Sequence, residues 1–159
     1  MFAGGGMKIR KYQEKDKGSV KKLIRKVLKE ICGLNPKQLD GRLKDLENIK
    51  NNFDVFFVAE DKEKIIGTVG LVKEEKDFAL TRLYVGKSYR RKGVAKKLCD
   101  KIENFCQNRG IKKIILSTTT EMESAINFYL KIGYKKINQI KIAKEGKKYN
   151  VIFMEKKIR

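Results

Sequence analysis

The stretch between residues 78 and 110 constrains the fold most, because it combines a strand, a basic turn and a long helix without interruption. The segment FALTRLYV has the apolar, β-branched and aromatic content of a strand. After it, apolar residues recur at three- and four-residue spacing, which predicts one buried helix face. These positions are Val94, Ala95, Leu98, Cys99, Ile102, Phe105 and Cys106. Gly110 stands where a C-terminal helix cap is expected, so the helix should end there.

The join between this strand and this helix has the composition of an anion site. Three cations, Arg90, Arg91 and Lys92, precede Gly93, and Ala95 follows in the first helical turn. The first turn of a helix has backbone N–H groups without intrahelical partners, and its dipole adds partial positive charge. Small side chains would let a phosphate approach these groups closely. The turn is neither a P-loop nor a dinucleotide fingerprint, because the required glycines are missing.

The remaining elements predict an α/β domain with a mixed sheet, in the order strand, two helices, three strands, helix, strand, helix, two strands. The second helix has a complete start signal, with Asn35 as N-cap, Pro36 at the first helical position and Gln38 placed for a capping box. The expected strands are residues 7–12, 53–60, 65–73, 78–85, 113–118, 134–142 and 148–156. The first expected helix begins at residue 16 or 18 and ends at 31. The second runs from 36 to 49, and the last runs from 121 to 131.

Two features of the composition limit the chemistry. The chain has no histidine, which excludes a histidine general base, Ser–His and Cys–His nucleophiles, and most zinc sites; we expect no metal. Its 39 Lys+Arg against 19 Asp+Glu give a net charge of +20. Such a charge attracts polyanions, so a weak polyanion contact is one interpretation. The other is a surface on which lysines are spread over all faces, since no block of five cations occurs.

Length and segment composition predict one domain from residue 7 to residue 159, after a disordered leader or remnant at residues 1–6. No apolar run approaches the ~20 residues of a membrane span, and no signal-peptide pattern is present. The three cysteines are typical of small core residues in a reducing compartment. The sequence therefore predicts a cytoplasmic protein without membrane contact, as a monomer or homodimer.

Two motifs resemble the GNAT superfamily of acyl-CoA-dependent N-acyltransferases. Residues 90–95, R-R-K-G-V-A, are similar to the family motif Q/R-x-x-G-x-G/A. Residues 124–129, S-A-I-N-F-Y, followed by I-G-Y at 132–134, resemble the family segment A-I-x-F/L-Y-x-x-x-G-F/Y. The order of elements from about Met7 also fits. The resemblance implies a mostly antiparallel seven-stranded sheet with about four helices.

The resemblance also implies an activity: transfer of an acetyl group from acetyl-CoA to a primary amine of unidentified origin, on a small molecule or a protein, by direct attack in a ternary complex. By this resemblance, Tyr129 protonates the leaving thiolate. The backbone of Leu83, Tyr84 and Val85 holds the pantetheine arm and polarises the thioester oxygen. The remaining cofactor-binding positions are Arg90, Arg91, Lys92, Gly93, Val94, Ala95, Lys96 and Asn127.

The general base does not follow from the resemblance. Where many relatives place a glutamate after the motif helix, this chain has Ser117 or Thr118. A water relay through Ser117, Thr118 or Thr119 and a base supplied by the acceptor both stay open. Glu121 and Glu123 lie near an expected helix start, where carboxylates stabilise the helix without any catalytic role. The alternative to an enzyme is a non-catalytic module on the same fold that senses CoA or binds polyanions. If it is an enzyme, its charge favours amines carried by acidic or polyanion-bound molecules.

Overall fold

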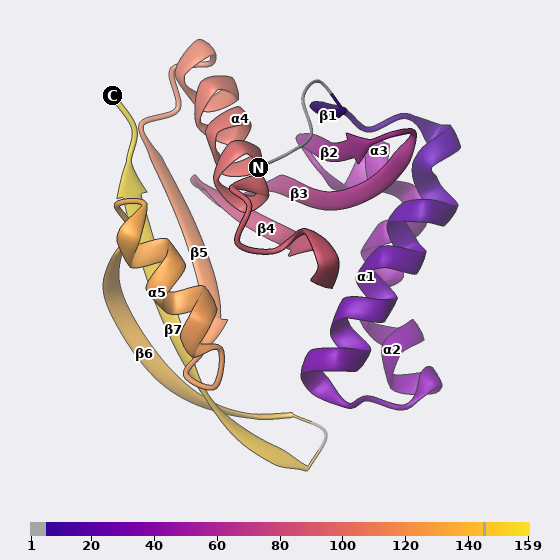
Figure 1. Ribbon diagram of the computed structural model, residues 1–159. Coiled ribbons are helices and arrows are strands. Elements are labelled where there is room, and N and C mark those ends of the chain that lie inside the picture. The colour runs from indigo at the N-terminus through magenta and orange to yellow at the C-terminus, as the bar shows by residue number, and fades with distance from the viewer. Residues whose placement is uncertain (1–5, 145) are drawn as a thin grey trace.

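The computed structural model describes residues 6–144 and 146–159, and across them one seven-stranded sheet organises the chain (Figure 1). The strands are β1 (Met7–Lys11), β2 (Val55–Asp61), β3 (Lys64–Glu74), β4 (Asp77–Val85), β5 (Lys113–Thr119), β6 (Lys135–Lys144) and β7 (Lys147–Lys157). The α-helices are α1 (Lys17–Cys32), α2 (Pro36–Arg42), α3 (Ile49–Asn52), α4 (Val94–Asn108) and α5 (Glu123–Lys131). The strand order is β1-β2-β3-β4-β5-β7-β6. Only β4 and β5 pair in parallel, so the predicted mixed, mostly antiparallel sheet is confirmed.

Helices cover both faces of the first half of the sheet. In β2, Phe57 belongs to the core beneath α4, whereas Phe56 and Val58 belong to the core beneath α1 and α2. Successive strand residues point to opposite faces, so α1 and α4 lie on opposite sides of the sheet. The apolar stripe predicted for α4 is the buried face of that helix, and Leu98, Ile102 and Cys106 are fully enclosed. No helix among the described residues is long and apolar enough to cross a membrane.

The segment after α1 departs from the predicted single helix over residues 36–49. Its start is as predicted, because the Asn35 side chain accepts from the Gln38 N–H and the capping box is complete. The helix then ends at Arg42 and continues as a 3₁₀ turn and the one-turn helix α3. The cause is a distant side chain. Arg82 of β4 donates to the Arg42 carbonyl, which would otherwise accept the next α-helical hydrogen bond. The described residues thus form five α-helices, where about four helices were expected.

The cysteines divide into two classes. Cys99 and Cys106 are buried in the core as predicted, and burial raises their thiol pKa values to about 12 and about 11. They are therefore protonated and unreactive at neutral pH. The prediction of a core position is wrong for Cys32, which is exposed at the last residue of α1. Ile31 beside it is 43% exposed, so the apolar stripe of α1 ends at Leu28.

The predicted leader lies mostly outside the described residues, which begin at Gly6. The Gly6 carbonyl accepts a hydrogen bond from the Lys62 N–H at 3.3 Å, which continues the pairing of β1 with β2. The turn between β2 and β3 lies where the charged segment 61–64 predicts it. Lys62 and Glu63 have φ values of 49° and 66°, as a tight hairpin turn requires.

One buried carboxylate ties the start of α1 to the edge of the sheet. Asp16 is 5% exposed and accepts two hydrogen bonds from the Arg10 guanidinium, at 2.7 and 2.9 Å. Glu60 of β2 accepts from the same guanidinium. The hydrogen bonds from Arg10 hold the pKa of Asp16 below its ordinary value, against the opposing effect of burial.

We expect Asp16→Asn to lower the free energy of unfolding by about 2 kcal/mol at pH 7, the scale of hydrogen bonds to a charged group. A carboxyl whose pKa is lowered in the folded state stabilises the fold above its unfolded pKa. That contribution is lost as pH falls below about 4. The difference between variant and wild type should therefore shrink toward pH 3, as measured by urea denaturation. A difference that is the same at pH 7 and pH 3 would contradict this role of the charge.

Candidate active site

The turn between β4 and α4 presents backbone donors without a protein partner. Gly93 is the N-cap of α4 with a φ of +82°, and no side chain caps the helix. The first intrahelical hydrogen bond runs from the Lys97 N–H to the Gly93 carbonyl, so the preceding N–H groups of the first turn are left for another acceptor. No acidic residue lies in this turn. Among the described residues, no atom lies within 4 Å of a Cβ built on Gly93, so the approach is open.

The predicted basic residues around this turn have different roles in the structure. Arg90 is held from two sides, because its Nε donates to the Val85 carbonyl at 2.9 Å and its Nη2 lies 3.5 Å from Glu30 of α1. Lys96 forms an ion pair with Asp100, one turn along α4. Arg91 has no ion pair or hydrogen bond within the described part of the chain. Lys92 lies over the Tyr89 ring at 5.9 Å. Arg91 and Lys92 are thus the cations that an incoming anion would meet unpaired.

The strands β4 and β5 separate immediately beyond their first contact. They pair only through Phe78 with Ile114 and Ala79 with Ile115. Thereafter β4 continues to Val85 and β5 continues to Thr119 without a register between them. The backbone groups along both facing edges are therefore available over the length of this opening, which we call the β4–β5 opening. Leu83, Tyr84 and Val85 lie along its β4 edge, where the sequence places the cofactor arm.

A bulge in β4 marks where the strand changes course. The register with β3 shifts between Thr68 and Gly70, and Arg82 has a φ of +55°. The Thr68 hydroxyl donates to the Arg82 carbonyl at 2.9 Å, and Thr68 is fully buried. The Arg82 side chain is held on the other face, with its Nε 3.0 Å and its Nη2 2.6 Å from the Asp45 carboxylate. Strained backbone held by such contacts is typical of functional sites.

Tyr129 of α5 is buried beside the core, and its hydroxyl has no hydrogen-bond partner among the described residues. Burial raises the pKa of this phenol, and the nearby Cys99 of α4 and Tyr84 of β4 raise it further. Tyr129 is therefore protonated at neutral pH, close to both α4 and the end of β4. The Tyr129 oxygen is not among the fully buried polar atoms that lack a partner, so it keeps some contact with solvent and can donate to water or to a ligand group.

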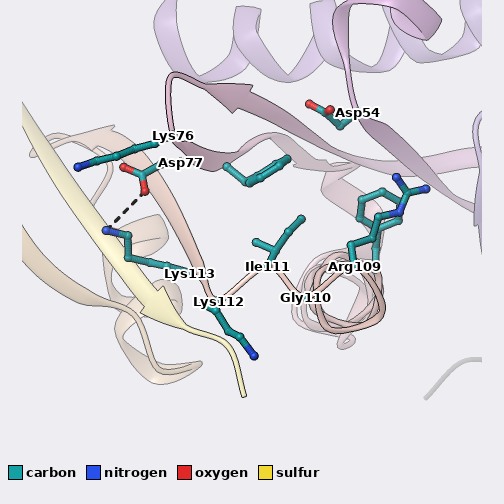
Figure 2. Close-up of a pocket in the computed structure, with 10 residues that line it drawn as sticks. Asp54, Lys76, Asp77, Arg109, Gly110, Ile111, Lys112 and Lys113 are labelled. Atoms are coloured by element: carbon teal, nitrogen blue, oxygen red, sulfur yellow. Dashed lines mark ion pairs between the residues drawn. The ribbon is translucent and has the colours of Figure 1, made fainter.

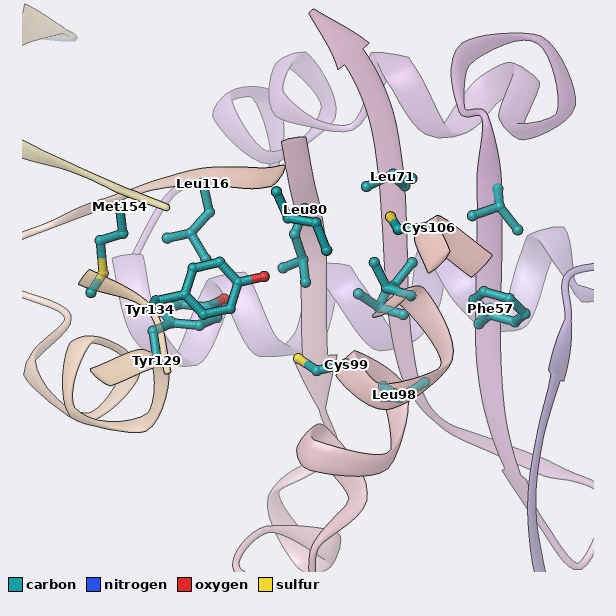
Figure 3. Close-up of a cluster of buried hydrophobic side chains, with 14 of the residues drawn as sticks. Phe57, Leu71, Leu80, Leu98, Cys99, Cys106, Leu116, Tyr129, Tyr134 and Met154 are labelled. Atoms are coloured by element: carbon teal, nitrogen blue, oxygen red, sulfur yellow. The ribbon is translucent and has the colours of Figure 1, made fainter. Parts of the chain in front are cut away.

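Tyr134 is a neighbour of Tyr129 that the sequence reasoning did not include in the site. The two rings pack edge to face with centroids 5.6 Å apart, between α5, β5 and β4 (Figure 3). Tyr134 is 3% exposed, and its hydroxyl, unlike that of Tyr129, is fully buried without a partner among the described residues. Burial raises its pKa as well. The sequence signal was only an aromatic residue after Gly133, which is equally typical of a core position.

No hydrogen bond or ion pair among the described residues joins the other predicted positions to Tyr129. Asn127 is exposed on α5, and its predicted contact with the cofactor arm stays a prediction. Glu121 and Glu123 are exposed near the start of α5. Ser117 is exposed on β5, and Thr118 and Thr119 are half-buried. The structure adds Glu30, whose carboxylate forms an ion pair with Arg90 of the turn. Sixty residues of sequence separate these partners, so no local pattern could have found the pair.

A hollow lies at the starts of β4 and β5, at the other end of β4 from Val85. It has a volume of about 490 Å³ and is lined by the end of α4 and the starts of both strands, including Phe78, Arg109 and Lys113 (Figure 2). Lys113 lies 3.6 Å from Asp77, and Arg109 stacks over Phe105 at 4.4 Å. Seven residues of strand separate Phe78 from Val85, about 23 Å. This hollow therefore lies beyond the paired residues Phe78 and Ala79 from the β4–β5 opening, and is remote from Val85.

Comparison with known proteins places these features in a family context. A family model described as the acetyltransferase (GNAT) family matches residues 20–134. Human N-acetyltransferase 8 is 37% identical over 90 residues, which cover 53% of this chain and 40% of that protein. A probable N-acetyltransferase, camello, of Xenopus tropicalis is 31% identical over 112 residues, covering 67% of this chain and 51% of that protein. The chain thus spans about half or less of the length of these relatives.

Solved structures show the same fold. An acetyltransferase of the GNAT family from Staphylococcus aureus Mu50 superposes with a TM-score of 0.81 at 25% identity, over 96% of this chain and 99% of that one. The PaiA N-acetyltransferase of Thermoplasma acidophilum, solved in complex with coenzyme A, gives a TM-score of 0.76 at 22% identity. That match covers 95% of this chain and 98% of the other.

Proposed function

The chain belongs to the acetyltransferase (GNAT) family, and from that premise we propose that it transfers the acetyl group of acetyl-CoA to a primary amine by direct attack in a ternary complex. The observation that carries the proposal is the β4–β5 opening, which leads from the uncapped start of α4 to the Tyr129 phenol, whose hydroxyl makes no hydrogen bond to the described residues. Acetyl-CoA supplies an activated thioester when it is bound. The chain has a group for each of the three parts of acetyl-CoA. Free N–H groups and cations would bind the phosphates, the strand edges would bind the amide-bearing arm, and a phenol would protonate the sulfur.

The turn before α4 binds the pyrophosphate in this proposal. The N–H groups of Val94, Ala95 and Lys96 point along the helix axis toward it, and Arg91 and Lys92 add charge-assisted bonds. A hydrogen bond to a charged group contributes about 1.5–3 kcal/mol, whereas the helix dipole contributes about 0.3–1 kcal/mol. Positioned donors therefore decide affinity. Arg90 has a different part, since it already links Val85 to Glu30 and so fixes the turn against α1.

The strand edges and the tyrosine perform the chemistry. Backbone N–H groups of Leu83 to Val85 hold the arm and polarise the thioester oxygen. The neutral amine attacks the thioester carbon, a C–N bond forms, and the C–S bond breaks. Tyr129 donates its proton to the departing sulfur, the amide nitrogen loses its extra proton to solvent, and the Tyr129 phenolate regains a proton from solvent. A phenol whose pKa is raised holds that proton at every pH near neutral.

We expect the protein to release free CoA thiol from acetyl-CoA only when a primary amine is supplied. The measurement is thiol release with a panel of amines and peptides, with mass spectrometry of the acetylated product. Release without amine measures hydrolysis and serves as the control. Saturable CoA binding together with no product from any amine would favour the sensing module and contradict the enzyme.

A cytoplasmic location is a further part of this proposal. Its support is the sequence pattern together with three cysteines that are all unpaired, two of them buried as thiols. Free buried thiols are typical of a reducing compartment.

A further inference from the structure

The hollow at the starts of β4 and β5 is walled by three segments that lie far apart in the sequence (Figure 2). Asp54, just before β2, contributes to it, as do residues 76–78 at the β3–β4 turn and the end of α4 together with residues 109–113. Tertiary contacts, rather than a single loop, therefore fix its shape. Its volume of about 490 Å³ lies within the range of small-molecule sites, about 300–1,000 Å³.

Apolar side chains form the part of the hollow nearest the core. Phe78 of β4, Phe105 of α4 and Ile111 line it, and all three pack against the core beneath α4. They are only half-buried, so each keeps some apolar surface in contact with water. Contact with the core holds these side chains in place, and an occupant with an apolar surface would remove part of theirs from water. The hollow therefore favours a ligand with an apolar body.

The rim of the hollow is rich in cations. Lys76, Arg109 and Lys112 line it and are exposed to solvent. None of the three has an ion pair within the described part of the chain. An anion that enters the hollow would therefore meet three positive charges that no carboxylate of the described residues already holds.

The two carboxylates that line the hollow are already engaged. Asp54 accepts a hydrogen bond from the Lys73 N–H at 2.7 Å, and Asp77 lies 3.6 Å from the ammonium group of Lys113. With Lys113 included, the lining residues carry four cations against these two carboxylates, a net charge of +2. An anionic occupant is therefore favoured over a cationic one.

Arg109 supplies a flat surface as well as a charge. Its guanidinium carbon lies 4.4 Å from the centroid of the Phe105 ring, so the group is held over that ring. A guanidinium stacks on aromatic rings, and its fork of N–H donors matches the oxygens of a carboxylate or a phosphate. The hollow thus combines the means to bind a planar ring with the means to bind an anionic group.

We propose that this hollow is a second ligand site, which binds a small anion that carries a planar aromatic ring, an aryl phosphate or an aryl carboxylate. The ring lies against Phe78 and Phe105, and the anionic group accepts hydrogen bonds from Arg109 and from the lysines of the rim. An inorganic anion would leave the apolar side chains in water, and an uncharged ring would leave the cations without a partner. The site is separate from that of acetyl-CoA, because Val85 lies about 23 Å along β4 from Phe78.

The test is isothermal titration calorimetry with phenyl phosphate, on the full chain in the presence of excess CoA so that the acetyl-CoA site is occupied. We expect a Kd below about 1 mM, with inorganic phosphate and benzyl alcohol each at least about tenfold weaker. Benzoate should bind about fivefold more tightly than cyclohexanecarboxylate, which has the same charge and a similar size but no aromatic face. Benzoate and AMP, each compared with phenyl phosphate, distinguish an aryl carboxylate from a nucleoside phosphate as the source of the shared chemistry.

The double variant Lys76→Ser, Lys112→Ser should raise the Kd for phenyl phosphate about tenfold, because it removes two charges from the rim. Both side chains are exposed and without an ion pair among the described residues, so the melting temperature should not change. The double variant Lys101→Ser, Lys131→Ser is the matched control. It removes two equally exposed lysines of α4 and α5 that do not line the hollow, and it should leave this Kd unchanged.

Weaker binding in the rim variant alone supports the site in the hollow. The proposal is overturned if phenyl phosphate binds both double variants as it binds the wild type, or if excess CoA abolishes its binding. It is also overturned if inorganic phosphate binds as tightly, since charge alone would then account for the attraction. Absence of binding up to about 10 mM phenyl phosphate has the same consequence.

Discussion

Gly93→Asp is expected to abolish the stabilisation of this protein by CoA. The carboxylate would stand at the start of α4, where the proposed pyrophosphate meets free N–H groups. At about 5 Å and an effective dielectric constant of about 20, each like-charge pair costs about 3 kcal/mol, which is about a hundredfold in Kd. The measurement is the melting temperature against CoA concentration, since a ligand that binds only the folded state raises it in a saturable way.

Gly93→Asn is the matched control, because asparagine has nearly the same size and tolerates the left-handed conformation about as well. Gly93 has a φ of +82°, so both variants carry similar backbone strain, and an added Cβ meets no described atom within 4 Å. The asparagine variant should keep a measurable CoA shift at higher concentrations. If the aspartate variant is folded and responds to CoA as the wild type does, the pyrophosphate site lies elsewhere.

Local patterns predicted the elements of this fold well, because each depends on neighbours in sequence. The spacing of apolar residues in α4 reports its buried face directly, and the capping box at Asn35 is formed as predicted. The family match to residues 20–134 confirms the resemblance inferred from the two motifs. The break after α2 could not be predicted in this way. It depends on Arg82, forty residues away, which takes the Arg42 carbonyl from the helix.

The candidate site could be predicted only where the sequence supplies a motif. Gly93 and Tyr129 belong to motifs, and the structure places them at the start of α4 and beside the end of β4. Tyr134 and Glu30 have no such signal, since their importance arises from a ring packed at 5.6 Å and an ion pair at 3.5 Å. The β4–β5 opening likewise depends on how strands distant in the sequence pair, and the bulge at Arg82 lies along its β4 edge. Side chains that come into contact only in the folded structure leave no characteristic spacing in the sequence.

Tyr129→Phe is expected to lower kcat about a hundredfold while leaving the affinity for CoA nearly unchanged. General acid catalysis by a positioned side chain contributes at least about that factor. The phenol hydroxyl makes no hydrogen bond within the described part of the chain, so its removal breaks no described contact. The ring, which packs against Phe128 and Tyr134, is retained. A loss in kcat with an unchanged Kd for CoA is the signature of an interaction made only in the transition state.

Tyr134→Phe is the matched control, because it removes the other hydroxyl of the same aromatic pair. That oxygen has no partner, so its loss should leave the melting temperature unchanged or higher, since an unsatisfied buried hydroxyl costs about 1–3 kcal/mol. It should also leave kcat within about twofold of the wild type, because only Tyr129 occupies the motif position. Equal loss of activity in both variants would mean that both hydroxyls are needed for the rate, which would contradict proton donation by Tyr129 alone. Full activity in Tyr129→Phe would mean that the tyrosine is only a core residue and that solvent protonates the departing thiolate.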